Sequence, residues 1–168
     1  YFSTEMKGLA GHLRTDIHEL PPQYIYSTGE GEKLFAPFDP DVPEVGDDLK
    51  ATAGILRDLI IEATRKRMDG VRASALSGGL DSSIVATIAK GFNPNLHLIT
   101  ATVDSKPGPD LENAILMAEF LGLEHHIYRI SDDEIFDCIP EMIWYLESFD
   151  EDCIVGQISN YYASYLAK

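Results

Sequence analysis

The sequence has little cysteine, few cations and no long apolar run, and each shortage narrows the class of protein. Cys138 and Cys153 are its only cysteines. They form no CxxC pair, no His/Cys spacing is typical of a zinc site, and no signal-peptide pattern is present. We therefore expect two buried, reduced thiols in a cytoplasmic protein. No stretch of 18 apolar residues occurs, which excludes a membrane-spanning helix.

Cations are scarce, with 13 Lys and Arg against 28 Asp and Glu, which gives a formal net charge of −15. Proteins that bind nucleic acid neutralise its phosphates with Lys and Arg, so this balance argues against that function. Nine of the acidic residues lie between Asp132 and Asp152. Two interpretations of this acidic run stay open, namely a solvated surface that keeps the protein soluble and a surface that recognises a basic partner.

The first 45 residues differ in pattern from the rest. The segment QYIYST-GEGE-KLFAPF predicts two strands around a glycine-containing turn, with Tyr24 and Tyr26 on one face. The segment APFDPDVPEVG then contains three prolines and a glycine, which is typical of a linker or a domain boundary. The chain opens without Met and ends within a predicted helix, so we expect both ends to continue in a longer protein.

From Asp47 onward the apolar spacing becomes helical, with Asp47 or Asp48 as the N-cap of the first helix. The basic cluster 65–67 falls in the last turn of that helix, where cations favour the helix dipole, and phosphate contact is the alternative. Strands and helices then alternate: strands at 71–76, 96–103 and 124–130, and helices at 82–90, 110–121, from 132 and from about 153. This alternation predicts an α/β fold with a doubly wound parallel sheet.

The stretch SGGLDSS, residues 77–83, stands where the first of these strands gives way to a helix. Gly78 and Gly79 let the backbone turn sharply and approach a ligand closely. Ser77, Ser82 and Ser83 add hydroxyl groups beside the N–H groups of the helix start, and such a nest binds phosphate or pyrophosphate. Asp81 would repel phosphates unless Mg²⁺ bridged them, so we expect Asp81 to be a magnesium ligand. The alternative is a glycine–serine turn in which Asp81 caps the helix.

The glycines are adjacent and no Lys follows them, so the motif is neither GxGxxG nor Walker A. SGGLDSS after a strand resembles the pyrophosphate loop (PP-loop) of the N-type ATP pyrophosphatases. The longer LSGGLDSS and the helix LKATAGILRDLIIEATRKRM before it resemble the synthetase domain of asparagine synthetases. Further segments are similar to that family: LHLITATV, GPDLENAILMAEFLGLEHH, LESFDE and YYASYLAK. The segment FSTEMKGL…ELPPQYIYS looks like the last strands of a class II glutamine amidotransferase domain.

The resemblance covers essentially the whole chain and implies two domains. Residues 1–45 would be the tail of the amidotransferase (Ntn-type) domain, a small β remnant with a linker. Residues 46–168 would begin the synthetase domain, with an adenine nucleotide α-hydrolase-like fold. The implied ATP-binding residues are Leu76, Ser77, Gly78, Gly79, Asp81, Ser82, Ser83 and, beside the adenine, Ala101. Asp81 would be the catalytic and metal-binding residue, with ATP and Mg²⁺ as cofactors.

The resemblance implies a ligase that adenylates the side-chain carboxylate of aspartate and transfers ammonia from glutamine, or free ammonia, to give asparagine. A homodimer is compatible with it, whereas nucleic acid and membrane are not expected partners. Two alternatives stay open: a related synthetase with another carboxylate acceptor, such as a cyclising amide synthetase, and a nucleotide-binding relative without turnover. In the family a catalytic Cys would precede Tyr1 and a second phosphate loop would follow Lys168. Val155 and Ser159 stand where many members carry Arg and Pro.

Three other groups of residues are candidates for function. His125 and His126 are adjacent on a predicted strand and point to opposite faces, which favours structural roles and disfavours a paired metal site. Asp110 is expected to cap its helix, or alternatively to border the active site with the loop DSKPGP. The aromatic residues of the last two helices have a spacing typical of core or interface positions: Trp144, Tyr145, Tyr161, Tyr162 and Tyr165.

Overall fold

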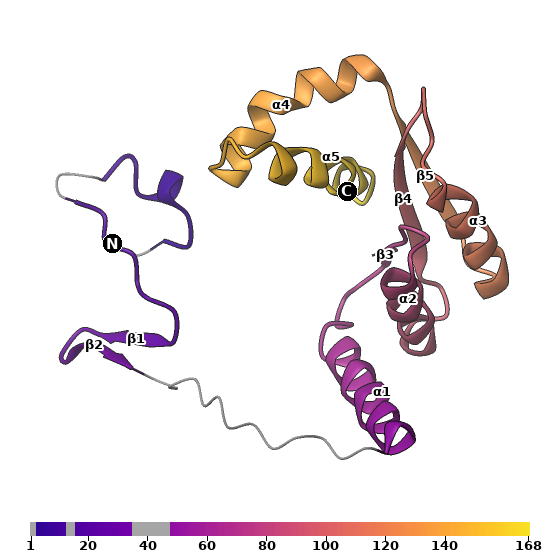
Figure 1. Cartoon of the computed structure of the whole chain (residues 1–168), viewed down its shortest axis with the longest axis horizontal. Helices are drawn as coiled ribbons and strands as arrows, with labels where there is room; N and C mark the ends of the chain where they lie inside the picture. The colour runs from indigo at the N-terminus through magenta and orange to yellow at the C-terminus, as the bar shows by residue number, and fades with distance from the viewer. Residues whose placement is uncertain (1–2, 13–15, 35–47) are drawn as a thin grey trace. The chain divides into compact units, whose positions relative to one another are not determined.

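The computed structural model describes residues 3–12, 16–34 and 48–168. The chain divides into two compact units, residues 1–52 and 53–168, and both are drawn in Figure 1. The predicted linker at 36–46 lies outside the described residues. Within the part of the chain that is described, no helix combines the length and the hydropathy needed to cross a bilayer.

The first unit contains a β-hairpin. Strands β1 (Tyr24–Ser27) and β2 (Gly31–Leu34) pair antiparallel, with Tyr24 opposite Leu34. Gly31 has φ +74°, a left-handed conformation that glycine adopts without steric cost. A short 3-10 helix, η1, covers Met6–Gly8. The predicted pair of strands is therefore confirmed, whereas its assignment to an amidotransferase domain stays a prediction.

The second unit is built on a parallel sheet of three strands in the order β3-β4-β5. Ala73 pairs with His97 and Leu98 with His125, which sets the register of both ladders. The strands are β3 (Ala73–Ala75), β4 (His97–Val103) and β5 (His125–Ile130). They are joined by helices α2 (Leu80–Phe92) and α3 (Asp110–Leu121). Because parallel neighbours need such crossovers, the sequence pattern of alternating strands and helices was sufficient to predict them.

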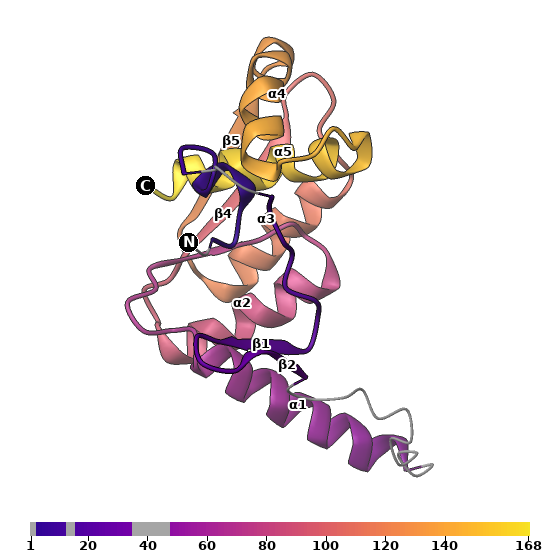
Figure 2. The same ribbon diagram turned by 90° about the vertical axis from the view of Figure 1, so that its left-hand side faces the viewer.

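Helices cover both faces of this sheet, as a doubly wound fold requires. On one face Leu98 is fully buried against apolar residues of α2 and α3, among them Ala86 and Ala114. On the other face Ile130 packs with residues of α4 (Asp132–Leu146) and α5 (Glu151–Leu166). Figure 1 shows α4 and α5 on one side of β4 and β5 and α3 on the other, and Figure 2 shows α5 lying across these strands. The predicted fold class is confirmed.

Three helix ends lie where the sequence predicted them, and each is held by a local capping interaction. Asp48 Oδ1 accepts N–H bonds from Lys50 and Ala51 at the start of α1 (Leu49–Arg65). Ser131 forms a capping box with the third residue of α4, and Gly122 ends α3 in the left-handed conformation. Pro140 lies inside α4, which continues through it.

The basic cluster at 65–67 has structural contacts. The Arg65 guanidinium pairs with Glu62 at 2.7 Å, and Arg67 Nη1 donates to the Ala63 carbonyl at 2.8 Å. The hydrogen bond from the Arg65 side chain lowers the pKa of Glu62. A cation on the last carbonyls of a helix completes groups that the helix itself cannot pair, in accordance with the structural interpretation.

Candidate functional site

The glycine–serine loop begins at the carboxyl end of β3 and is anchored there by the neighbouring strand. Leu76 is 1% exposed, and its N–H donates to the Ile99 carbonyl at 2.8 Å. The Thr100 hydroxyl donates to the Leu76 carbonyl. Both backbone groups of Leu76 are therefore held by β4, which fixes the direction in which the loop leaves the sheet.

A histidine continues this support from β5. His125 Nε2 lies 2.8 Å from the Thr100 hydroxyl oxygen. Because that hydroxyl already donates its proton to Leu76, Nε2 carries the hydrogen and donates to Thr100. Burial lowers the pKa of His125, and the neighbouring His126 lowers it further. A neutral imidazole is the form that this arrangement stabilises, so His125 has a structural role as predicted.

Inside the loop the serines bond to one another and to the backbone. Ser82 Oγ lies 2.9 Å from Ser77 Oγ and accepts the Ser77 N–H at 3.1 Å. Ser83 Oγ donates to the Gly79 carbonyl at 2.7 Å. These bonds hold residues 77–83 as one turn without using the first N–H groups of α2, because the N-cap Gly79 has no side chain to accept from them.

Position 78 is where the loop most strictly requires glycine. Its φ is +88°, and a Cβ at this position would lie 2.0 Å from the Asp110 carbonyl oxygen and 2.9 Å from Ala114 N. The loop backbone therefore packs directly on the first turns of α3. Gly79 differs, because an added Cβ would meet only Ser77 Oγ, at 3.4 Å.

Asp81 is exposed in the first turn of α2 and has no hydrogen bond or ion pair with any described residue. An unpartnered carboxylate at the start of a helix, beside N–H groups that favour anions, has the donor chemistry of a Mg²⁺–phosphate site. Mg²⁺ is commonly held by one or two carboxylates together with substrate phosphates. The residues present thus fit this cation.

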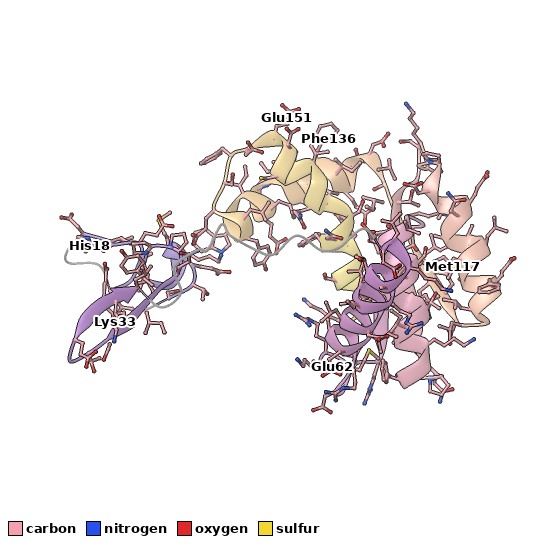
Figure 3. All side chains as sticks on the ribbon, turned by 60° about the horizontal axis from the view of Figure 1, so that its bottom comes forward. His18, Lys33, Glu62, Met117, Phe136 and Glu151 are labelled. Carbon is pink, nitrogen blue, oxygen red and sulfur yellow. The ribbon has the colours of Figure 1, made fainter. Side chains whose placement is uncertain are left out.

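Two hollows adjoin the loop. A cavity of about 370 Å³ brings together Leu76, Ser77 and Ala101. Gly78, Gly79 and Ser83 line a second hollow of about 460 Å³ against α3, where Met117, labelled in Figure 3, forms part of the wall. Asp81 and Ser82 line neither, although Ser82 bonds to Ser77. The structure therefore brings Ala101 beside Leu76 and Ser77, whereas Asp81 lies outside both hollows.

The cavity also has walls that sequence reasoning did not assign to it. Lys106 in the loop after β4, and Ser159 and Asn160 on α5, line it. Asp110 lines it too, and the N-cap of α3 is Pro109, so the structure favours the second of the two roles expected for Asp110. Lys106 could have been found from the strand order, because loops at the carboxyl ends of neighbouring strands lie close together. No local signal would have found Asn160, which is 77 residues after the end of the loop.

The two cysteines differ from each other. Cys138 is buried, and its burial raises the pKa of its thiol. Cys153 is exposed, so the expectation of two buried thiols is wrong for this residue. The Asp150 carboxylate, which caps α5, raises the pKa of Cys153. Cys153 falls on the outer face of α5, which the sequence spacing alone did not reveal.

Aromatic residues of α4 and α5 divide between core and surface. Tyr162 is buried, stacks on Tyr128 with ring centroids 5.1 Å apart, and donates to the Glu134 carbonyl at 2.8 Å. The Tyr161 hydroxyl donates to Glu141, which raises the pKa of Tyr161 to about 12. Phe136 and Glu151, labelled in Figure 3, lie on exposed faces of these helices.

Fold and loop together define a doubly wound α/β protein with a glycine–serine loop at the carboxyl end of a strand. The asparagine synthase family matches residues 55–168. The chain is 31% identical over 166 residues to asparagine synthetase (glutamine-hydrolyzing) of Brassica oleracea, and 32% identical over 164 residues to that of Zea mays. Each alignment covers 89% of this chain and 27% of the relative. The chain belongs to the asparagine synthase family.

The chain spans about a quarter of the length of these curated relatives. Among solved structures, an NH3-dependent NAD synthetase from Campylobacter jejuni, in complex with nitrate, aligns with 20% identity and a TM-score of 0.41. That alignment covers 60% of this chain and 44% of the other.

Proposed function

We propose that the protein containing this chain is an ATP-dependent, glutamine-hydrolysing asparagine synthetase. The single observation that carries the proposal is the loop of residues 77–83 at the carboxyl end of β3, in a chain of the asparagine synthase family. Ligands of open parallel sheets bind at that edge, where loops from successive strands converge. The loop offers hydroxyl and N–H donors and lacks the lysine on which Walker-type loops depend.

The loop residues would hold the phosphates of ATP. The unpaired N–H groups at the start of α2 are suitable donors to the β- and γ-phosphates. The hydroxyls of Ser77, Ser82 and Ser83 would join them by rotating away from the bonds that they make within the loop. Ala101, in the wall of the adjoining cavity, would contact the adenine, because its small side chain leaves room for a flat ring. Lys106 in the same wall supplies a cation for the α-phosphate or the acceptor carboxylate.

Asp81 would hold Mg²⁺ together with the departing pyrophosphate. When bound, this cation neutralises the charge that builds up on the pyrophosphate as it leaves. Asp81 is suited to that task because no other described residue competes for its carboxylate. The Asp81 carboxylate is thus assigned to metal binding rather than to contact with the nucleoside.

The reaction has two steps. An oxygen of the aspartate side-chain carboxylate attacks the α-phosphorus of ATP, the bond between the α-phosphorus and the bridging oxygen breaks, and pyrophosphate leaves. Ammonia then attacks the acyl carbon of the adenylate, AMP leaves with the bonding electrons, and the nitrogen loses a proton to give asparagine. The protein contributes most by fixing donors around the pyrophosphate before it forms.

Residues 1–45 are proposed to end a glutamine amidotransferase domain that releases ammonia from glutamine. The hairpin β1–β2 supports this only as a β element of suitable size. Neither cysteine of the chain is proposed as its nucleophile, because Cys138 is buried and an acidic neighbour raises the pKa of Cys153. We further propose a cytoplasmic location and a homodimer.

Isotope exchange between pyrophosphate and ATP in the purified protein tests the function. Exchange that depends on aspartate, with AMP and asparagine as products once glutamine or ammonia is added, would support the proposal. ADP and orthophosphate as the only aspartate-stimulated products would overturn it. Replacement of both cysteines, Cys138→Ser and Cys153→Ser, serves as a control and should leave glutamine-dependent synthesis unchanged.

A further inference from the structure

Three potential metal ligands meet at the amino-terminal ends of β4 and β5, away from the loop site. His97 begins β4, Glu124 immediately precedes β5, and His126 is the second residue of β5. Glu124 and His126 are two residues apart, so their side chains emerge on one face of the strand. The parallel register sets Glu124 beside His97, since the Leu98 N–H donates to the Glu124 carbonyl at 2.8 Å. As predicted, His125 and His126 point to opposite faces of the sheet. His126, however, lies next to His97 of the neighbouring strand.

The ligand atoms converge on one point. His97 Nδ1 and His126 Nε2 are 2.9 Å apart. Each of these nitrogens lies 3.5 Å from an oxygen of Glu124, Oε2 for His97 and Oε1 for His126. One ligand atom from each residue can be chosen such that all three lie within 4.8 Å of one another. Two imidazoles and a carboxylate therefore face a shared centre.

These separations are close to those around a tetrahedral ion, which the side chains could reach by small rotations. Zn²⁺ binds imidazole nitrogen and carboxylate oxygen at about 2.0–2.2 Å, which places neighbouring ligand atoms about 3.3–3.6 Å apart in a tetrahedral site. The two nitrogens, 2.9 Å apart, are slightly closer than this, and each lies 3.5 Å from one of the two Glu124 oxygens. A set of two histidines and one glutamate with a fourth, solvent-filled position is a known zinc arrangement. The side chains are 37–66% exposed, so an ion can enter from solvent.

We propose that His97, Glu124 and His126 bind one divalent transition-metal ion, for which Zn²⁺ is the probe, with solvent as the fourth ligand. Imidazole favours first-row transition metals, whereas Mg²⁺ prefers oxygen ligands. The site is therefore chemically distinct from the magnesium site proposed at Asp81. It lies at the opposite end of the sheet and does not depend on the proposed enzymatic activity.

Calorimetric titration of the purified chain with Zn²⁺, in buffer containing excess Mg²⁺, tests the site. We expect one Zn²⁺ per chain, and a rise in melting temperature, since the ion binds the folded state. Each of the substitutions His97→Gln, Glu124→Gln and His126→Gln should weaken binding by more than about 100-fold, beyond the 10- to 100-fold cost of losing an outer-shell partner. X-ray absorption at the zinc edge should show nitrogen and oxygen at about 2.0–2.1 Å and no sulfur at 2.3 Å.

Matched controls separate this site from others that bind zinc. His125→Gln alters the neighbouring histidine on the opposite face, Cys153→Ser removes the exposed thiol, and Asp81→Asn removes the loop carboxylate. All three should retain the full affinity. Glu124 has the most exposed side chain of the trio, so Glu124→Gln keeps the test valid if a histidine variant fails to fold. No binding by the wild-type chain, a sulfur-containing shell, or equal affinity in Glu124→Gln would each overturn the proposal.

Discussion

Substitution of Gly78 by alanine should disrupt the loop more than the same substitution at Gly79. The new Cβ would lie 2.0 Å from the Asp110 carbonyl oxygen. An ordinary contact needs about 3.5 Å, so the loop or α3 must move by more than about 1 Å. Alanine at φ +88° adds a conformational cost of about 1–2 kcal/mol. Overpacking a tight contact typically costs about 1–3 kcal/mol more.

We therefore expect Gly78→Ala to lower the free energy of unfolding by about 2–5 kcal/mol. Two variants divide this cost into its parts. Gly122→Ala has the positive φ, +59°, but an added Cβ meets nothing within 4 Å, so it measures the conformational cost alone. Gly79→Ala has ordinary backbone angles and one contact at 3.4 Å, so its effect should stay within about 1 kcal/mol.

Urea unfolding followed by circular dichroism measures these differences, and isotope exchange between pyrophosphate and ATP measures the functional cost. A displacement of about 1 Å in a positioning element can lower the rate by about 10²-fold. Gly78→Ala should show such a loss even where the protein remains folded, whereas Gly122→Ala should not. If Gly78→Ala matched Gly122→Ala in stability and kept the exchange rate, the close packing of the loop on α3 would be refuted.

Three further substitutions test the site and its support. Asp81→Asn should lower exchange by about 10²- to 10³-fold at saturating Mg²⁺, and a wild-type rate in the folded variant would refute the metal role. Lys106→Met should raise KM for ATP or for aspartate by about 10- to 100-fold, the worth of one hydrogen bond to a charged group, while Lys50→Met on the exposed face of α1 should change neither. Because the folded state lowers the pKa of His125, its neutral form favours folding, and stability is lost as the pH falls below about 6.5. His125→Gln should flatten that loss in urea unfolding between pH 7 and pH 5, and an unchanged pH dependence would show that His125 is not its source.

Local chemistry made the elements predictable. Each helix and strand in residues 48–168 has its own signal, such as the Ser131 and Glu134 capping box or the Gly122 end of α3. These signals act over three or four residues, so a sequence contains them in full. The loop was predictable for the same reason, since its glycines and serines all lie within residues 77–83.

Contacts between distant segments were not predictable in this way. Asn160 reaches the cavity only because α5 lies across β4 and β5, and no pattern within α5 states which face it presents there. The exposure of Cys153 follows from the same placement. His97 and His126 are 29 residues apart, and a shift of the β4–β5 register by one residue would separate them. The register results from packing on both faces of the sheet and is absent from any local segment.

The parallel sheet keeps the two proposed sites of this chain apart. Ala101, in the wall of the cavity beside the loop, is four residues along β4 from His97, roughly 13 Å at 3.3 Å per residue. That separation exceeds the Debye length of about 8 Å at physiological ionic strength. A cation held by His97, Glu124 and His126 would therefore change the potential at the loop very little. It would act instead on the β4–β5 ladder, where its ligands join the first residues of both strands. Because no residue belongs to both sites, zinc affinity and exchange rate should respond independently to substitutions at either end.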